Sequence, residues 1–221
     1  MKLLLKIALT LAIVFASTFI VIKMSGLLTV DDIKQGFENL RNGPMLMIGL
    51  LVVVLLFADL FIAVPTMTVI MLSGYFLGFS TAMLFSFTGV ALAALTGYLL
   101  SRRFGDMLLQ KVEPNAKNRQ QTYELFQRHG MWVLILSRAM PILPEVSACL
   151  AGTCKMRFAK FLFGWSIGTI PYLVIVTYVG SISSVHKPMP AIMTAIVVTS
   201  ILWAGWLLLS RHAKKARLKD N

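Results

Sequence analysis

Long apolar stretches alternate with short polar ones along the whole chain. The apolar stretches cover about residues 3–22, 45–72, 80–100, 131–152, 161–181 and 191–210. A stretch of about 20 apolar residues can cross a bilayer as a helix, so the pattern predicts an all-α polytopic membrane protein. We expect residues 3–22 to be a retained transmembrane helix rather than a cleaved signal sequence, because no small-residue cleavage site precedes Lys23.

Two polar sections predict helices outside the membrane. In residues 29–44, Ile33, Phe37 and Leu40 recur at helical spacing with charged residues between them. This pattern predicts a short amphipathic helix on the extracytoplasmic membrane surface. The section 102–129 is expected to hold a second polar helix, which ends at Gly130 because glycine favours helix C-termini.

Prolines interrupt two of the apolar stretches. Pro65 lies within the stretch 45–72, and Pro141 and Pro144 lie within the stretch 131–152. Proline removes a backbone donor and interrupts a straight helix. Broken backbone is tolerated at membrane depth only where protein or water surrounds it. We therefore expect two re-entrant helical hairpins, broken by these prolines together with Gly74 and Gly152.

Composition and charge support a membrane protein with a defined orientation. Hydrophobic residues make up 57% of the chain and charged residues 14%, while the net charge is +12. The positive charge falls between apolar stretches, as the positive-inside bias of membrane proteins predicts, so no nucleic-acid partner is expected. If both hairpins return to the side they enter from, the basic residues outside are only Lys23, Lys34, Arg41 and Lys187. Both termini are then cytoplasmic, in what we expect to be a bacterial inner membrane.

This topology contains an internal repeat. Each half consists of a re-entrant hairpin followed by a transmembrane helix, and the two hairpins enter from opposite sides, as in transporters with inverted repeats. Flanking transmembrane helices complete the predicted fold. We divide the chain into an N-terminal helix (1–28), an amphipathic extracytoplasmic helix (29–44), a transport domain (45–184), and a C-terminal helix with a basic cytoplasmic tail (185–221).

Three charged residues lie within the predicted hairpins: Asp59, Arg138 and Glu145. An arginine at membrane depth costs roughly 2.5–3.5 kcal/mol, so Arg138 needs a partner or water. The three residues could form an ion pair that only joins the hairpins. Alternatively, Arg138 binds a lipid phosphate while Asp59 or Glu145 takes up a proton. Asp59 is expected to lie farther from Arg138 and to be the acid that changes protonation near neutral pH.

No motif for catalysis or metal binding accompanies these charges. The chain has no nucleophile elbow, no His-Glu-x-x-His motif and no phosphate-binding glycine loop. Cys149 and Cys154 have no neighbouring histidine and are expected to be packing residues. We therefore expect neither an enzyme nor a cofactor or metal.

The second half of the chain resembles the DedA family, the bacterial branch of the VTT-domain (SNARE-associated Golgi protein) superfamily. The matching pattern comprises His129-Gly130, Arg138-x-x-Pro141, Ala151-Gly152 followed by Met156 and Phe161, then Gly168 and Tyr178-x-Gly180. In the first half, Pro65 and Gly74 fit the first hairpin of the family. The resemblance covers about residues 45–184.

Three positions depart from the DedA pattern. Met67 replaces an acid, Pro144 replaces a second arginine, and Asp59 matches another acidic position only approximately. The proline spacing looks closer to the Tvp-type Golgi branch and its bacterial relatives. The resemblance implies transport or scrambling of a phospholipid or a polyprenyl-phosphate lipid, with protons as a coupling ion. A scaffold without transport is the alternative, and an intramembrane enzyme is a further one.

The predicted topology places Gln120 and Lys155 on the same, cytoplasmic side, although an apolar stretch separates them. Single cysteines at these two positions, with Cys149 and Cys154 replaced, should react with an impermeant thiol reagent from the same side of the membrane. Labelling from opposite sides would contradict the re-entrant second hairpin.

Overall fold

The computed structural model describes residues 17, 30–41, 43–62, 64–112, 115–139 and 143–183. The regular structure in these ranges is helical: α2 (Val30–Asn39), α3 (Met45–Ala58), α4 (Thr66–Leu77), α5 (Phe79–Val112), α6 (Ala116–Leu136), the 3-10 turn η1 (Ser137–Ala139), α7 (Leu143–Thr153) and α8 (Phe158–Ile182). Apart from Ser17, the helices predicted in 1–28 and 185–221 lie outside the described residues.

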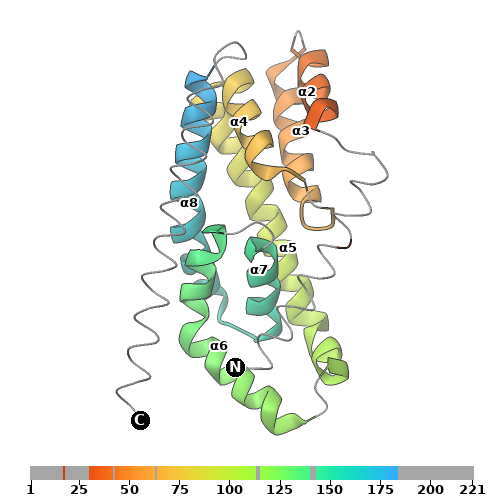
Figure 1. Ribbon diagram of the computed structural model, residues 1–221, viewed down its shortest axis with the longest axis vertical. Helices are drawn as coiled ribbons and strands as arrows, with labels where there is room; N and C mark the ends of the chain where they lie inside the picture. The colour runs from red at the N-terminus through yellow and green to blue at the C-terminus, as the bar shows by residue number, and fades with distance from the viewer. Residues whose placement is uncertain are drawn as a thin grey trace.

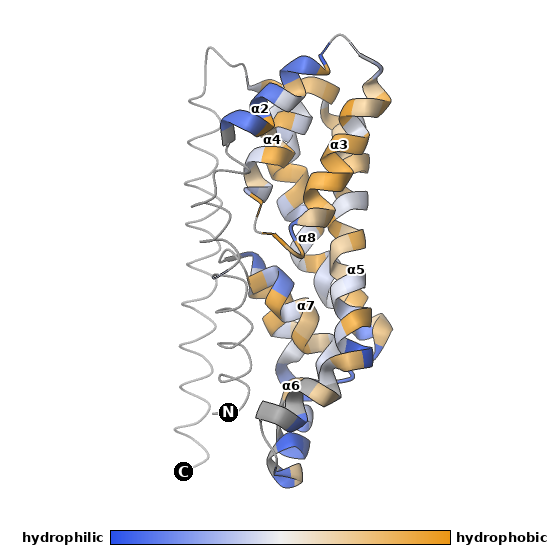
Figure 2. Cartoon of the chain, turned by 90° about the vertical axis from the view of Figure 1, so that its right-hand side faces the viewer, coloured by the Kyte–Doolittle hydropathy of each residue, from blue (hydrophilic) through white to orange (hydrophobic). Residues whose placement is uncertain are grey.

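Helices α5 and α8 run along the long axis of the bundle (Figure 1). In the described ranges, Phe79–Gly105 and Phe158–Ile182 are the helical segments long and apolar enough to cross a membrane. Helix α8 buries Phe161 and Leu173 but exposes Phe163 and Ile175. A helix that is apolar on both its packed and its exposed face suits a lipid environment. In Figure 2 the polar residues gather towards the two ends of the bundle, at α2 and at the outer part of α6.

Two helical pairs approach the middle of the bundle from opposite ends (Figure 1). Helices α3 and α4 lie at the end that carries α2, and their connecting loop points towards mid-length. Helices α6 and α7 lie at the other end, and the last turn of α6 and the first turn of α7 also lie towards mid-length. Pro65 directly precedes α4, and Pro144 lies in the first turn of α7. Both positions suit proline because the first turn of a helix leaves its N–H groups unpaired.

Each short helix packs on the long helix of the other half of the chain. Helix α4 contacts α8 extensively, and α7 contacts α5 extensively. The remaining large contacts join α3 to α5 and α6 to α8. The two halves are therefore interlocked rather than side by side.

Glycines make these crossings close. A Cβ atom added at Gly74 would lie 2.4 Å from the Thr177 carbonyl oxygen, and one added at Gly180 would lie 2.3 Å from the Met71 carbonyl oxygen. A Cβ atom at Gly152 would lie 2.1 Å from the Tyr98 carbonyl oxygen of α5. Small residues of this kind allow the backbones of membrane helices to approach.

The structure corrects three predicted helix interruptions. Gly74 and Gly152 were expected to break the hairpins but lie inside α4 and α7, where they permit the crossings. Helix α6 does not end at Gly130 but continues to Leu136. A glycine inside a helix costs only about 1 kcal/mol relative to alanine, and the Phe126 ring occupies the space beside Gly130.

The predicted amphipathic helix corresponds to α2. Ile33 and Phe37 are buried, and the Phe37 ring lies 5.5 Å from the ring of Phe76 on α4. The exposed side carries two ion pairs, Lys34 with Asp31 and Arg41 with Glu38. The apolar face of α2 is therefore occupied by the rest of the protein rather than left open for lipid.

At the opposite end, the turn between α7 and α8 is tied to its neighbours. Lys155 has a positive φ of 52°, and the turn closes through bonds from Lys155 N to Gly152 O and from Met156 N to Ala151 O, the pattern of a helix C-cap. Tyr98 Oη and Arg102 Nη1 both donate to the Met156 carbonyl oxygen. Lys155 also lines a surface cleft together with Gln120, so these two positions lie at the same end of the bundle.

Replacing Gly152 with alanine tests the closest crossing. The new methyl group would meet the backbone of α5, so Gly152→Ala should destabilise the protein by about 1–3 kcal/mol. Gly36→Ala is the matched control, since its Cβ atom would make an ordinary 3.7 Å contact with Leu51. Thermal unfolding in detergent compares the two variants. Equal stability of both would contradict the close contact of α7 with α5.

Candidate functional site

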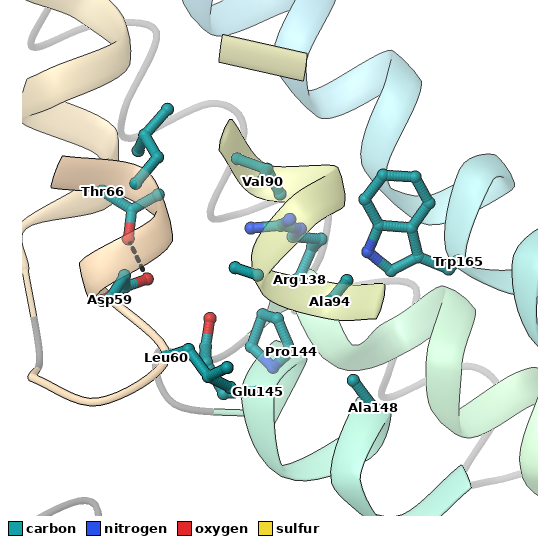
Figure 3. A pocket seen from close by; sticks show the side chains of 12 residues that line it. Asp59, Leu60, Thr66, Val90, Ala94, Arg138, Pro144, Glu145, Ala148 and Trp165 are labelled. Carbon is teal, nitrogen blue, oxygen red and sulfur yellow. Dashed lines mark hydrogen bonds between the residues drawn. The ribbon is translucent and has the colours of Figure 1, made fainter. Parts of the chain in front are cut away.

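The ends of the two hairpins enclose a small cavity at mid-bundle (Figure 3). Its lining comes from α3 and the following loop, from α4 and α5, from η1 and α7, and from α8. The lining residues are Leu56, Asp59, Leu60, Thr66, Val90, Ala93, Ala94, Arg138, Pro144, Glu145, Ala148 and Trp165. The structure thus brings together the three charged residues that the sequence singled out.

Asp59 organises the loop between α3 and α4. Its Oδ1 atom accepts a hydrogen bond of 2.9 Å from the Val64 backbone N–H, and its Oδ2 atom accepts one of 2.8 Å from the Thr66 hydroxyl. The first bond satisfies a donor in the irregular segment just before α4, where no helical partner is available. The carboxyl group is therefore fixed at the tip of the first hairpin.

Glu145 lies at the corresponding tip of the second hairpin, in the first turn of α7. A negative charge is favoured there because the helix dipole is positive at its N-terminus. The carboxyl groups of Glu145 and Asp59 line the same cavity as Arg138. Two carboxyl groups that share a site disfavour each other's ionised form. The pair is therefore suited to hold a proton.

Arg138 projects from η1 towards α8. Its Nε atom lies 3.4 Å from the Thr169 hydroxyl oxygen, and its guanidinium carbon lies 5.2 Å from the centre of the Tyr172 ring. Such a distance permits a cation–π interaction. Among the residues that the structure describes, no carboxylate oxygen lies within the 4.0 Å of an ion pair with Arg138. The direct ion pair considered from the sequence is therefore absent from this part of the chain.

The cavity itself has a volume of about 20 Å³, which is room for about one water molecule. The site is therefore closed in this conformation, and a group larger than water can enter only if the lining residues separate.

Four contributors to the site were not predicted: Thr66, Trp165, Thr169 and Tyr172. Pro171 could have indicated the last two, since it lies inside the apolar helix α8 and removes the hydrogen bond to the Ile167 carbonyl group. Pro141 lies outside the described residues.

Cys149 and Cys154 are buried free thiols. In the described ranges, no cluster of three His, Cys, Asp or Glu side chains could hold a metal ion.

The chain is similar in sequence to several membrane proteins. It is 31% identical over 124 residues to an uncharacterized membrane protein of Mycobacterium tuberculosis, a match that covers 51% of this chain and 55% of the relative. It is 28% identical over 138 residues to protein DedA of Escherichia coli, covering 57% of this chain and 62% of DedA. The chain thus spans little more than half the length of these relatives. No solved structure matches it significantly.

The match to a protein family is broader. The VTT domain matches residues 64–182, which comprise more than half of the chain and contain Thr66, Arg138 and Glu145. Asp59 lies just before the matched region. The matched residues include both helices that are long and apolar enough to cross a membrane. The chain therefore belongs to the DedA family of VTT-domain membrane proteins.

Proposed function

We propose that the protein moves a phosphate-bearing lipid across the membrane, with Arg138 binding the phosphate and the Asp59–Glu145 pair carrying protons. One observation carries the proposal: Arg138 lies at mid-bundle, beside two carboxyl groups, without a carboxylate at ion-pair distance in the described part of the chain. The lipid is a membrane phospholipid or a polyprenyl phosphate. The membrane is a bacterial cytoplasmic membrane.

Arginine suits a phosphate site for a geometric reason. Its planar guanidinium group carries five N–H donors and binds phosphate through two parallel hydrogen bonds. In the described structure only the Nε–H of Arg138 has a hydrogen-bond acceptor, the Thr169 hydroxyl oxygen, at the long distance of 3.4 Å. The donors at the outer edge of the guanidinium group therefore remain for a ligand.

The packing of the two halves supports an inverted repeat. In each half a short helix has a proline before it or in its first turn and crosses the long helix of the other half at a glycine. Helix α4 crosses α8 at Gly74, and α7 crosses α5 at Gly152. Transporters with inverted repeats bind their substrates where such broken helices meet near the bilayer midplane. We infer that rocking of one hairpin against the other opens the closed cavity to one side at a time.

Charge balance links the lipid phosphate to protons. With both carboxyl groups ionised, Asp59, Glu145 and Arg138 together carry one negative charge, which repels an anionic phosphate. One proton makes the group neutral, and a second makes it positive. Because unbalanced charge is costly in a site removed from water, entry of the phosphate is favoured when the carboxyl pair holds a proton.

Substitution of Arg138 tests the phosphate role in vesicles that contain the reconstituted protein and a fluorescent phospholipid. Arg138→Ala should lower the rate of lipid movement by about 100-fold, the effect of losing two charge-assisted hydrogen bonds. The folded protein should persist, because no direct ion pair is broken. Arg103→Ala, which removes an exposed arginine of α5, serves as the control.

The alternatives give different results in the same assay. If Arg138 has only a structural role, Arg138→Ala should lower the unfolding temperature in detergent, because its contacts with Thr169 and Tyr172 are lost. A scaffold without transport would leave the wild-type protein inactive in vesicles. Hydrolysed lipid in the vesicles would instead indicate an intramembrane enzyme.

The pH dependence of transport tests the carboxyl pair. Between about pH 5.5 and 8.5, wild-type transport should fall as the pH rises, because protons leave the pair and the site becomes negative. Asp59→Asn should flatten this profile, and the double variant Asp59→Asn/Glu145→Gln should abolish it. Asp31→Asn, which neutralises an acid in the exposed Lys34 ion pair, should keep the wild-type profile. A double variant with the wild-type profile would exclude both acids from proton coupling.

A further inference from the structure

Two side chains of helix α8 contact Arg138, and neither of them is a carboxylate. Thr169, whose side chain is buried, accepts from Arg138 Nε, and the Tyr172 ring lies beneath the guanidinium carbon. Thr169 and Tyr172 are three positions apart and so project from neighbouring points of one helix face. Trp165, one turn before Thr169, lines the cavity from the same face. This face of α8 is therefore the surface against which Arg138 rests.

We propose that Thr169 and Tyr172 are positioning residues that fix Arg138 while leaving its phosphate-binding edge unoccupied. The inference rests on the proposed function and assigns residues that determine headgroup affinity in that site.

The chemistry of the guanidinium group explains why these two residue types suit the task. An aromatic ring attracts the flat face of the cation. A hydroxyl oxygen bonded to Nε occupies only the Nε–H donor and leaves the Nη donors unoccupied. A carboxylate would instead bind two N–H groups of the guanidinium at once, which is the two-point geometry that phosphate also uses. Thr169 and Tyr172 thus stabilise the charge and leave the outer edge to the lipid.

The location of this face on α8 gives the arrangement a rigid base. Thr169 and Leu173 are buried, and α8 is in turn fixed by its close contact with α6, where a Cβ atom at Gly168 would lie 2.8 Å from the Ile135 carbonyl oxygen. Ile135 lies one turn before Arg138 on the same stretch of chain. The crossing of α6 and α8 at Gly168 therefore fixes the position of Arg138 relative to Thr169 and Tyr172.

Transport kinetics in phospholipid vesicles test the proposal with paired variants. Tyr172→Leu removes the ring and should raise KM for the labelled lipid about 5- to 30-fold with little change in the maximal rate. Tyr172→Phe keeps the ring and should retain the wild-type KM. Thr169→Val should raise KM, whereas Thr169→Ser should not. Tyr178→Leu, which removes an exposed tyrosine of the same helix, should behave as wild type.

A second readout does not depend on transport. In protein labelled with ¹⁵N-arginine in detergent micelles, the Nε–H signal of Arg138, assigned with Arg138→Lys, should carry a ring-current shift. The shift should disappear in Tyr172→Leu and persist in Tyr172→Phe. An unchanged signal or an unchanged KM in Tyr172→Leu would overturn the positioning role. A wild-type protein that moves no lipid but shows the ring-current shift would instead contradict the proposed function alone.

Discussion

Charged side chains at the middle of a helical membrane protein must be shielded from lipid, and in this protein two helices too short to cross a membrane provide the shielding. Helices α4 and α7 bring the hairpin tips to mid-bundle, where Asp59, Arg138 and Glu145 line one cavity. Their positions depend on backbone contact at Gly74 and Gly152. Any larger residue there would push the short helices outwards and separate the tips.

The site combines one arginine and two carboxyl groups, and in the described part of the chain the arginine has no carboxylate at ion-pair distance. The Thr169 hydroxyl group and the Tyr172 ring support Arg138 from α8, while Asp59 is bound to its own loop through Val64 and Thr66. In the described residues these contacts hold each charged group separately, so the arginine and the carboxyl groups are positioned by different elements.

The sequence was sufficient to find the charged residues of the site and the amphipathic helix α2. Asp59, Arg138 and Glu145 stand out because ionisable residues are rare in apolar stretches, and Ile33 and Phe37 show the helical period directly. The local pattern could not predict which surfaces meet. The local sequence predicts interruptions at Gly74 and Gly152, whereas the role of these glycines depends on α8 and α5, which are distant in the sequence. Thr169 and Tyr172 were missed for the same reason, since a polar residue within an apolar helix has no local sign of its partner.

The continuity of α6 through Gly130 has a mechanical consequence. This helix runs as one rod from Ala116 at the polar end of the bundle to Leu136, and η1 with Arg138 follows directly. Its tight contact with α8, at Ile135 and Gly168, lies close to the arginine. The same helix is also held nearer its middle, where Lys160 of α8 donates to the Gln127 carbonyl oxygen and Gly164 faces Met131. A displacement of the outer end of α6 therefore meets these contacts before it reaches the segment that carries Arg138.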